Sequence, residues 1–134
     1  MRMSIFFVIA AILGFSACSS TKYEPAKESV SSNGKNVTVS LRSNPTTGFS
    51  WECAIQNPEV AKVTSDSYKQ DKTPRGMLGV GGIQTFVLNC VGEGRTEITF
   101  TYRRPWEGGD TAQVRNAVLS VDKNLRGTLD FVTD

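Results

Sequence analysis

The sequence has 134 residues, which suits one domain, and 39% of them are hydrophobic, enough for a sizeable core. Its 15 Lys and Arg against 13 Asp and Glu give a net charge of +2, too small for a general nucleic-acid binder. Because the chain contains no His, Ser–His and Cys–His catalysis and His-ligated zinc are excluded, and we expect no enzyme activity, no metal site and no cofactor.

The first 17 residues have the pattern of a signal peptide. A short positive start precedes an apolar run from Ile5 to Gly14, which is too short to cross a bilayer as a helix. Small residues then lead to Cys18, and the Ser-Ala-Cys ending resembles a bacterial lipobox, although Phe15 stands where Leu is commonest. We expect lipidation of Cys18 and an exported protein anchored in a bacterial membrane, either periplasmic or on the cell surface. Ordinary cleavage after Ser19 is the alternative.

The segment that follows, residues 18–34, is rich in Ser, Lys and Glu and poor in apolar residues. We interpret it as a flexible tether that lifts a domain off a membrane surface. The domain itself is expected over residues 35–122. Residues 123–134 would be a C-terminal extension of unknown role, in which Leu125 to Asp134 either add an edge strand or hang free.

Short alternations of apolar and polar residues, separated by turn residues, run through the domain. The expected strands are residues 36–41, 49–55, 60–63, 83–91, 97–103 and 114–121. Residues 65–82 are polar and Gly-rich without clear periodicity, so we expect a long loop of a kind that is commonly functional. About seven short strands with frequent turns predict an all-β protein, an immunoglobulin-like β-sandwich.

Two cysteines stand on predicted strand faces that also carry large apolar residues. Cys53 shares a face with Trp51, and Cys90 shares one with Phe86. With Cys18 assigned to lipid, they form an even pair in an exported protein, which favours a disulfide between them. Two buried free thiols are the alternative.

Three loops carry unusual residues, and alternate connections of such a sandwich emerge at the same end. The first, Asn44–Gly48, combines an Asn that can cap a turn, a Pro with fixed φ and a Gly that permits positive φ. The second, Gly79–Gly82, would let another backbone approach closely. The third contains Arg104 and Trp106, residue types that dominate interface energetics. Each loop alone has an ordinary structural interpretation, but together they predict a wedge suited to a cleft.

The segments NPTTGFSW from Asn44, GVGG from Gly79 and YRRPW ending at Trp106 resemble, in order and spacing, the chagasin-like inhibitors of papain-like cysteine peptidases. The resemblance covers roughly residues 36–122. It implies an immunoglobulin-like fold that inserts the three loops into the active-site cleft of a peptidase. The lipoprotein-type leader, the cysteine pair and the tail depart from the family pattern.

The resemblance also assigns roles to the loops. Thr46 and Thr47 would lie nearest the catalytic Cys of the peptidase, the second loop would lie along its backbone, and the Trp106 ring would stack on one of its aromatics. The implied peptidase-binding residues are Asn44, Pro45, Thr46, Thr47, Gly48, Gly79, Val80, Gly81, Gly82, Arg104, Pro105 and Trp106. The implied function is reversible, tight-binding inhibition in a one-to-one complex, with no small-molecule substrate. An immunoglobulin-like adhesion or assembly module that binds another protein or a glycan is the alternative.

Overall fold

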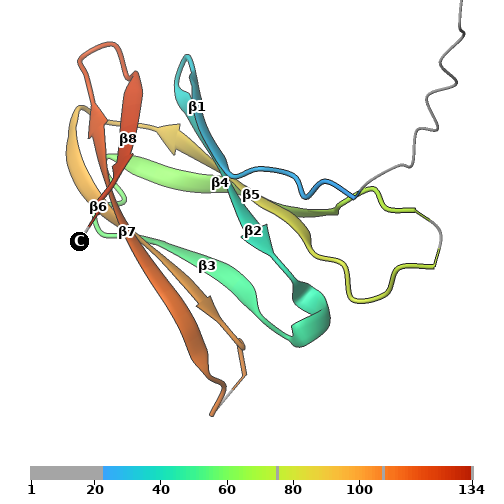
Figure 1. Cartoon of the computed structure of the whole chain (residues 1–134). Coiled ribbons are helices and arrows are strands. Elements are labelled where there is room, and N and C mark those ends of the chain that lie inside the picture. Colours follow the sequence, from blue (N-terminus) through green and yellow to red (C-terminus); the bar gives the residue numbers. More distant parts are fainter. Residues whose placement is uncertain (1–22, 75, 107, 134) are drawn as a thin grey trace, which may run out of the picture.

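The structure is a computed structural model, and it describes residues 23–74, 76–106 and 108–133, so the predicted signal peptide and Cys18 lie outside the described residues. Its elements are β1 (Ser29–Asn33), β2 (Asn36–Ser43), the short 3-10 helix η1 (Pro45–Thr47), β3 (Ser50–Ile55), β4 (Ala61–Gln70), β5 (Gly82–Cys90), β6 (Gly94–Arg103), β7 (Thr111–Val121) and β8 (Gly127–Phe131) (Figure 1). No helix in these ranges is long and apolar enough to span a membrane. The prediction of an all-β fold is confirmed.

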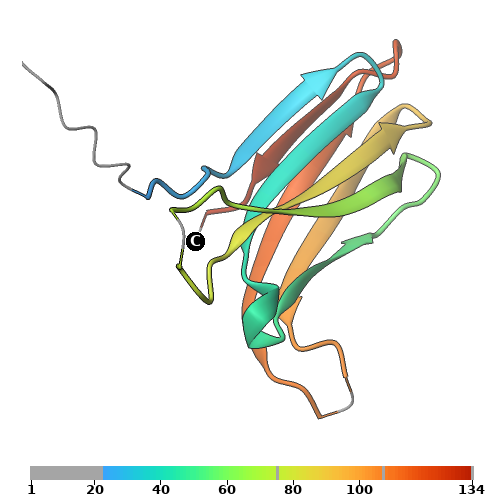
Figure 2. The same ribbon diagram turned by 90° about the vertical axis from the view of Figure 1, so that its right-hand side faces the viewer.

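The strands form two antiparallel sheets of four strands each. Sheet A has the order β1-β2-β5-β4, and sheet B has the order β3-β6-β7-β8. The chain passes from sheet A to sheet B after β2, returns after β3, and crosses again after β5. Figure 1 and Figure 2 show the resulting two-layered sandwich.

The core lies between the sheets and follows from the period-two pattern of the strands. Every second residue of β2 and β5 is buried, as expected for strands with one covered face. The Phe86 ring from sheet A meets the Phe100 ring from sheet B, with ring centroids 5.7 Å apart. The largest fully buried side chains are Phe86, Phe100, Leu41, Leu88, Ile98 and Leu119.

The predicted tether is wrong for residues 29–33, which form β1. They pair with residues 36–40 of β2 in an antiparallel hairpin. All five side chains of β1 are exposed. The strand therefore contributes hydrogen bonds but little core, and its polar sequence carries no apolar alternation from which it could be predicted.

The predicted loop over residues 65–82 is wrong in its first part. Strand β4 continues to Gln70 and stays paired with β5, with a register shift between Val63 and Ser65. After Ala61 every residue of β4 is exposed, so the strand has no buried face to mark it in the sequence. The C-terminal extension does add an edge strand, β8, whose Leu129 is only 7% exposed.

The predicted disulfide is not formed, because Cys53 and Cys90 are free thiols in different surroundings. Cys90 is buried against Gly127: a Cβ added at Gly127 would lie 2.7 Å from the Sγ of Cys90. Burial raises the pKa of the Cys53 thiol to about 12, and the charge of Asp66 adds to this rise. Cys53 on β3 pairs with Phe100 on β6, and the Phe100 ring packs against Phe86. Phe86 stands four residues before Cys90 on β5, which corresponds to about 13 Å along a strand. The two thiols therefore belong to different levels of the sandwich.

Candidate functional site

Three loops project from one end of the sandwich (Figure 2). We call them loop 1 (residues 44–49, between β2 and β3), loop 2 (residues 71–81, between β4 and β5) and loop 3 (residues 104–110, between β6 and β7). In sheet A the last residues of β2 and β4 both pair with Gly82, the first residue of β5. In sheet B the first residue of β3 pairs with the last residue of β6. The pairing thus brings the three loops together, as predicted.

Loop 1 is a single 3-10 turn fixed by its own side chains. The Oδ1 of Asn44 accepts hydrogen bonds from the N–H of Thr46 at 3.3 Å and from its hydroxyl at 2.5 Å. The Thr47 hydroxyl donates to the Asn44 carbonyl at 2.7 Å. Gly48 leaves the turn with a φ of +83°, and its N–H donates to the Pro45 carbonyl at 2.9 Å. The side chains of Pro45, Thr46 and Thr47 stay exposed at the tip.

An aromatic platform supports loop 1 from below. The Tyr102 hydroxyl accepts a hydrogen bond from the Asn44 N–H at 2.9 Å. The Tyr102 ring stacks on Trp51 with centroids 4.9 Å apart and packs against Phe49 at 5.4 Å. Trp51 is itself held by a hydrogen bond from its Nε1 to the Arg42 carbonyl at 2.7 Å. Loop 1 therefore rests on rigid core side chains.

A buried glutamine joins the two sheets beneath the loops. Gln84, which is 6% exposed, accepts the Trp51 N–H at 2.8 Å and donates to the Trp51 carbonyl at 2.9 Å. It also donates to the Asp66 carboxylate at 2.9 Å. This residue was missed at the sequence level, where the available signal was a polar residue on the core face of an otherwise apolar alternation.

Loop 2 is tied to loop 1 by a side chain and by close backbone approach. The Asn44 Nδ2 donates to the Gly79 carbonyl at 3.0 Å. A Cβ at Gly81 would lie 2.9 Å from the Ser43 carbonyl oxygen, so only glycine allows this approach. Glycine is needed here as predicted, but at Gly81 it allows loop 2 to pack against residues at the start of loop 1 in the same chain.

The exposed part of loop 2 differs from the predicted one. Among the four predicted residues only Gly79 is exposed, because Val80 is 5% exposed and the two glycines after it are buried. The exposed tip is instead formed by Met77 and Leu78, whose exposures are 44% and 95%. The prediction missed both residues, although two apolar residues within a polar loop were a usable signal.

Loop 3 lies against loop 1 through Trp106. A Cβ at Gly48 would lie 2.6 Å from Cη2 of the indole, so the ring sits directly on this glycine. The Trp106 side chain nevertheless stays exposed, with 53% of the residue accessible. The expected exposure of Trp106 is therefore confirmed, with one edge of the ring used to join loops 3 and 1.

Arg104 is also shared between loops 1 and 3. Its Nε donates to the Thr47 carbonyl at 3.3 Å, and its Nη1 pairs with Asp110 at 3.2 Å. Its guanidinium lies over the Phe49 ring, 4.6 Å from the centroid, in a cation–π contact. Arg104 therefore has a bracing position within the loop cluster, while Pro105 and Trp106 beside it are exposed.

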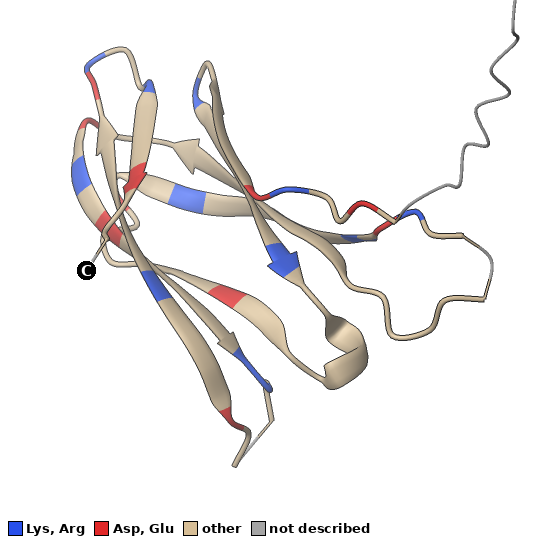
Figure 3. Ribbon diagram, in the orientation of Figure 1, with Lys and Arg blue, Asp and Glu red and all other residues tan. Residues whose placement is uncertain are grey.

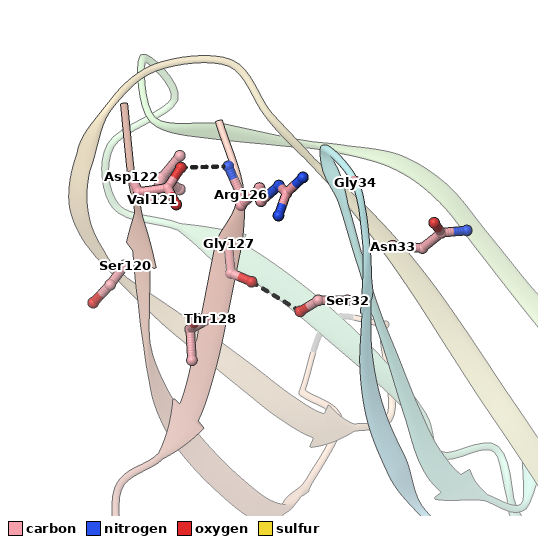
Figure 4. Close-up of a pocket in the computed structure, with 9 residues that line it drawn as sticks. All are labelled: Ser32, Asn33, Gly34, Ser120, Val121, Asp122, Arg126, Gly127 and Thr128. Carbon is pink, nitrogen blue, oxygen red and sulfur yellow. Dashed lines mark hydrogen bonds between the residues drawn. The ribbon is translucent and has the colours of Figure 1, made fainter. Parts of the chain in front are cut away.

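A separate cleft of 780 Å³ lies at the opposite end, between the β1–β2 and β7–β8 turns (Figure 4). Two of its polar side chains, Asp122 and Ser32, are engaged in those turns. Asp122 accepts hydrogen bonds from the N–H groups of Asn124 and Arg126 at 2.9 and 3.0 Å. The Ser32 hydroxyl donates to the Gly127 carbonyl at 2.8 Å. Within the described ranges no group of three or more Cys, Asp or Glu could hold a metal ion. The loop end is thus the candidate functional site.

Comparisons with known proteins find relatives over most of the chain. Residues 30–121 match the family model described as Chagasin family peptidase inhibitor I42. The chain is 31% identical to amoebiasin-2 of Entamoeba histolytica over 112 residues, covering 81% of this chain and 89% of the relative. It is 33% identical to chagasin of Trypanosoma cruzi over 78 residues, covering 56% of this chain and 70% of the relative.

A solved structure gives the same result for the fold. The crystal structure of the cysteine protease inhibitor EhICP2 from Entamoeba histolytica superposes with a TM-score of 0.52 at 30% identity, over 62% of this chain and 73% of that one. The prediction of an immunoglobulin-like sandwich is confirmed by this likeness. Sequence and fold together show that the chain belongs to the chagasin family of peptidase inhibitors.

Proposed function

We propose that the protein inhibits papain-like cysteine peptidases by inserting loops 1, 2 and 3 reversibly into the active-site cleft, in a one-to-one complex. Membership of the chagasin family supports the activity. The observation that carries the mechanism is the mutual bracing of the loops, through Asn44 to Gly79 and through Arg104 to Thr47. Loops held in this way lose little conformational entropy on docking, which favours tight binding.

Loop 1 would occupy the centre of the cleft. Its exposed tip, Pro45–Thr47, is a 3-10 turn and not an extended strand, so it offers the nucleophile no extended scissile bond. The hydrogen bonds of Asn44 hold this turn, and deformation into an extended conformation would break them. The inhibitor would therefore be bound without being cleaved.

Loops 2 and 3 would contact the two sides of the cleft. Loop 2 presents the exposed apolar side chains of Met77 and Leu78, and loop 3 presents that of Trp106. Apolar and aromatic side chains that become buried at the centre of an interface commonly carry most of its binding energy. In this arrangement Arg104 acts mainly by fixing loop 3 to loop 1.

The interaction would be noncovalent on the inhibitor's side. Cys90 is 1% exposed, and burial raises the pKa of Cys53 to about 12, with a further contribution from Asp66. Neither thiol is therefore an accessible thiolate that could exchange with a peptidase Cys.

Enzyme kinetics tests this function. Papain and a cathepsin L-type peptidase would be titrated with the chain from Ser19 onward, which keeps every described strand, while hydrolysis of a small substrate is followed. We expect stoichiometric, reversible inhibition and an uncleaved inhibitor. No inhibition at micromolar concentrations by the folded chain would contradict the proposal and favour an adhesion or assembly module.

We also propose that the protein is exported and lipid-anchored in a bacterial membrane through Cys18. The pattern of the first 18 residues supports this. Because Tyr23 contacts Asp71 at the start of loop 2, the anchor would attach the domain near its loop-bearing end. Incorporation of a labelled fatty acid in a bacterial host should be lost in Cys18→Ser and retained in Cys53→Ser; equal labelling of both would contradict the assignment.

A further inference from the structure

The N-terminal segment Tyr23–Glu28 leads from β1 toward loop 2 (Figure 1). Figure 3 shows acidic and basic residues alternating where this segment meets the base of the loop. Three of its residues form hydrogen bonds with the sandwich: Tyr23 and Ala26 with the Asp71 side chain, and Glu28 with the Arg42 N–H. The segment is therefore part of the loop-bearing end, although the family model begins only at residue 30.

The centre of these contacts is the carboxylate of Asp71, whose side chain is only 3% exposed. It accepts a hydrogen bond from the Tyr23 hydroxyl at 2.7 Å and forms an ion pair with the Arg42 guanidinium at 2.6 Å. The Ala26 N–H is a third, longer donor at 3.4 Å. We call Tyr23, Ala26, Arg42 and Asp71 the clamp.

Asp71 also lies where the two ends of loop 2 meet. It directly follows β4, and its own N–H donates to the Gly81 carbonyl at 3.1 Å, closing the loop. The Gln70 side chain also joins the two ends of the loop, because it donates a hydrogen bond to the Val80 carbonyl at 3.3 Å. Contacts that fix the Asp71 side chain therefore fix both ends of loop 2.

Arg42 connects the clamp to the rest of the site. It lies on β2, two residues before Asn44, and its guanidinium also donates to the Ala26 carbonyl at 3.3 Å. Its N–H donates to the Glu28 carboxylate at 3.1 Å, and the same carboxylate pairs with Arg115 of sheet B at 2.8 Å. The N-terminal segment is thus attached to both sheets and to the stems of loops 1 and 2.

The electrostatics of the clamp agree with its geometry. Burial alone would raise the pKa of Asp71, but hydrogen bonds from Tyr23 and Arg42 outweigh it and hold the pKa below the ordinary value. Loss of the Arg42 guanidinium would leave this buried carboxylate with an uncompensated charge, and loss of the Tyr23 hydroxyl would remove one of its hydrogen bonds; both changes disfavour the arrangement. The N-terminal segment thus supplies two of the hydrogen-bond donors that fix the Asp71 carboxylate, the Tyr23 hydroxyl and the Ala26 N–H.

We infer that the clamp is a positioning device for inhibition: residues 23–28 hold loop 2 in the orientation in which it can enter the cleft beside loop 1. The inference rests on the proposed function. Tyr23, Arg42 and Asp71 are then positioning residues outside the three loop motifs. If loosening the clamp leaves loop 2 correctly placed for about a tenth of the time, the apparent inhibition constant rises roughly tenfold.

The test compares two clamp variants with a matched control in the chain from Ser19 onward. Asp71→Asn removes the charge, whereas Tyr23→Phe removes only one hydroxyl and leaves the ion pair. Asp130→Asn on β8 makes the same chemical change as Asp71→Asn at an exposed position. For each variant, the inhibition constant for papain and the hydrogen exchange of backbone amides are measured.

We expect a roughly tenfold higher inhibition constant for Asp71→Asn, a smaller rise for Tyr23→Phe and none for Asp130→Asn. Exchange should accelerate in loop 2 and stay unchanged in β6 and β7. The double variant of Tyr23 and Asp71 should be no weaker than Asp71→Asn, because both changes break one unit.

Other results overturn the inference. An unchanged inhibition constant, fully additive effects, or a rise that accompanies faster exchange throughout β6 and β7 would each exclude a positioning role. If the unaltered chain inhibits no peptidase, the proposed function fails by itself. In that case exchange still tests the clamp: faster exchange of loop 2 in both clamp variants supports it, and unchanged exchange overturns it.

Discussion

The indole of Trp106 in loop 3 packs directly on Gly48, the residue that ends the 3-10 turn of loop 1. This contact is possible because Gly48 has no side chain: a Cβ added at Gly48 would lie 2.6 Å from Cη2 of the ring. Its φ of +83° is also one that glycine adopts far more readily than other residues. Loops 1 and 3 therefore form one continuous surface.

Gly48→Ala should separate these loops. The new methyl group displaces the Trp106 ring, and the positive φ adds roughly 1–2 kcal/mol of strain. We expect weaker inhibition and a lower melting temperature. Gly34→Ala is the matched control, because Gly34 has a φ of +60° but nothing within 4 Å of the added Cβ. The control should lose stability and keep the inhibition constant of the unaltered chain. Equal inhibition constants for both variants would contradict a role of the Trp106–Gly48 contact in binding.

Trp106→Ala should weaken inhibition by roughly 1–3 kcal/mol, the range typical of an interface hot spot. The reason is loss of the ring that becomes buried against the peptidase. Val132→Ala, at a similarly exposed apolar residue with 54% accessibility outside the three loops, should leave the inhibition constant unchanged. An unchanged inhibition constant for Trp106→Ala would remove this residue from the interface.

Leu78→Ala should weaken inhibition by about 1 kcal/mol or more while leaving the free energy of unfolding within about 0.5 kcal/mol. Leu78 is 95% exposed and supports nothing in the free protein, so its role can only appear on binding. Inhibition constants and urea denaturation of the same samples give both quantities. Loss of stability without loss of inhibition would show that the exposed tip of loop 2 does not enter the cleft.

Gln84→Ala should destabilise the fold by roughly 1–3 kcal/mol, because the Trp51 N–H and carbonyl lose their buried partners. Urea denaturation measures this change. Gln113→Ala, on an exposed position of β7, serves as the control and should be near neutral. A neutral Gln84→Ala would contradict the role of this amide in joining the sheets.

Acid should weaken the clamp. Asp71 has a lowered pKa in the folded protein, where burial opposes ionisation but hydrogen bonds from Tyr23 and Arg42 favour it more. Its contribution to stability is therefore present above the ordinary Asp pKa of about 3.9 and is lost as the pH falls through the lower folded value. The difference in free energy of unfolding between the unaltered chain and Asp71→Asn should narrow below about pH 4. A difference that stays constant through this range would contradict the ionised clamp.

Most of the fold was predictable because most strands have one buried face. The alternation that ends at Leu41 on β2, and that runs through Phe86 and Leu88 on β5, predicted those strands within one or two residues. Strand β1 and the second half of β4 were not predicted, since all their side chains are exposed. A strand that contributes hydrogen bonds but no core leaves no periodic signal.

The candidate site was predicted as three loops but not as contacts between them. Motif spacing located Asn44 and Trp106 and their common end of the sandwich. It could not show that Arg104 binds loop 1, or that Asp71 binds Tyr23 across 48 residues, because such pairs depend on the folded geometry. The disulfide prediction failed for the same reason: facing the core does not bring two thiols to one level of it.

Insertion of the loops into the cleft is the central claim, and calorimetric titration of two forms of papain tests it most directly. One form has an empty cleft, and the other carries a covalent peptide-based reagent on its catalytic Cys that fills the cleft. The account predicts tight one-to-one binding of the chain from Ser19 onward to the empty form and no measurable binding to the filled form. Equal binding to both forms would place the contact outside the cleft and contradict the account.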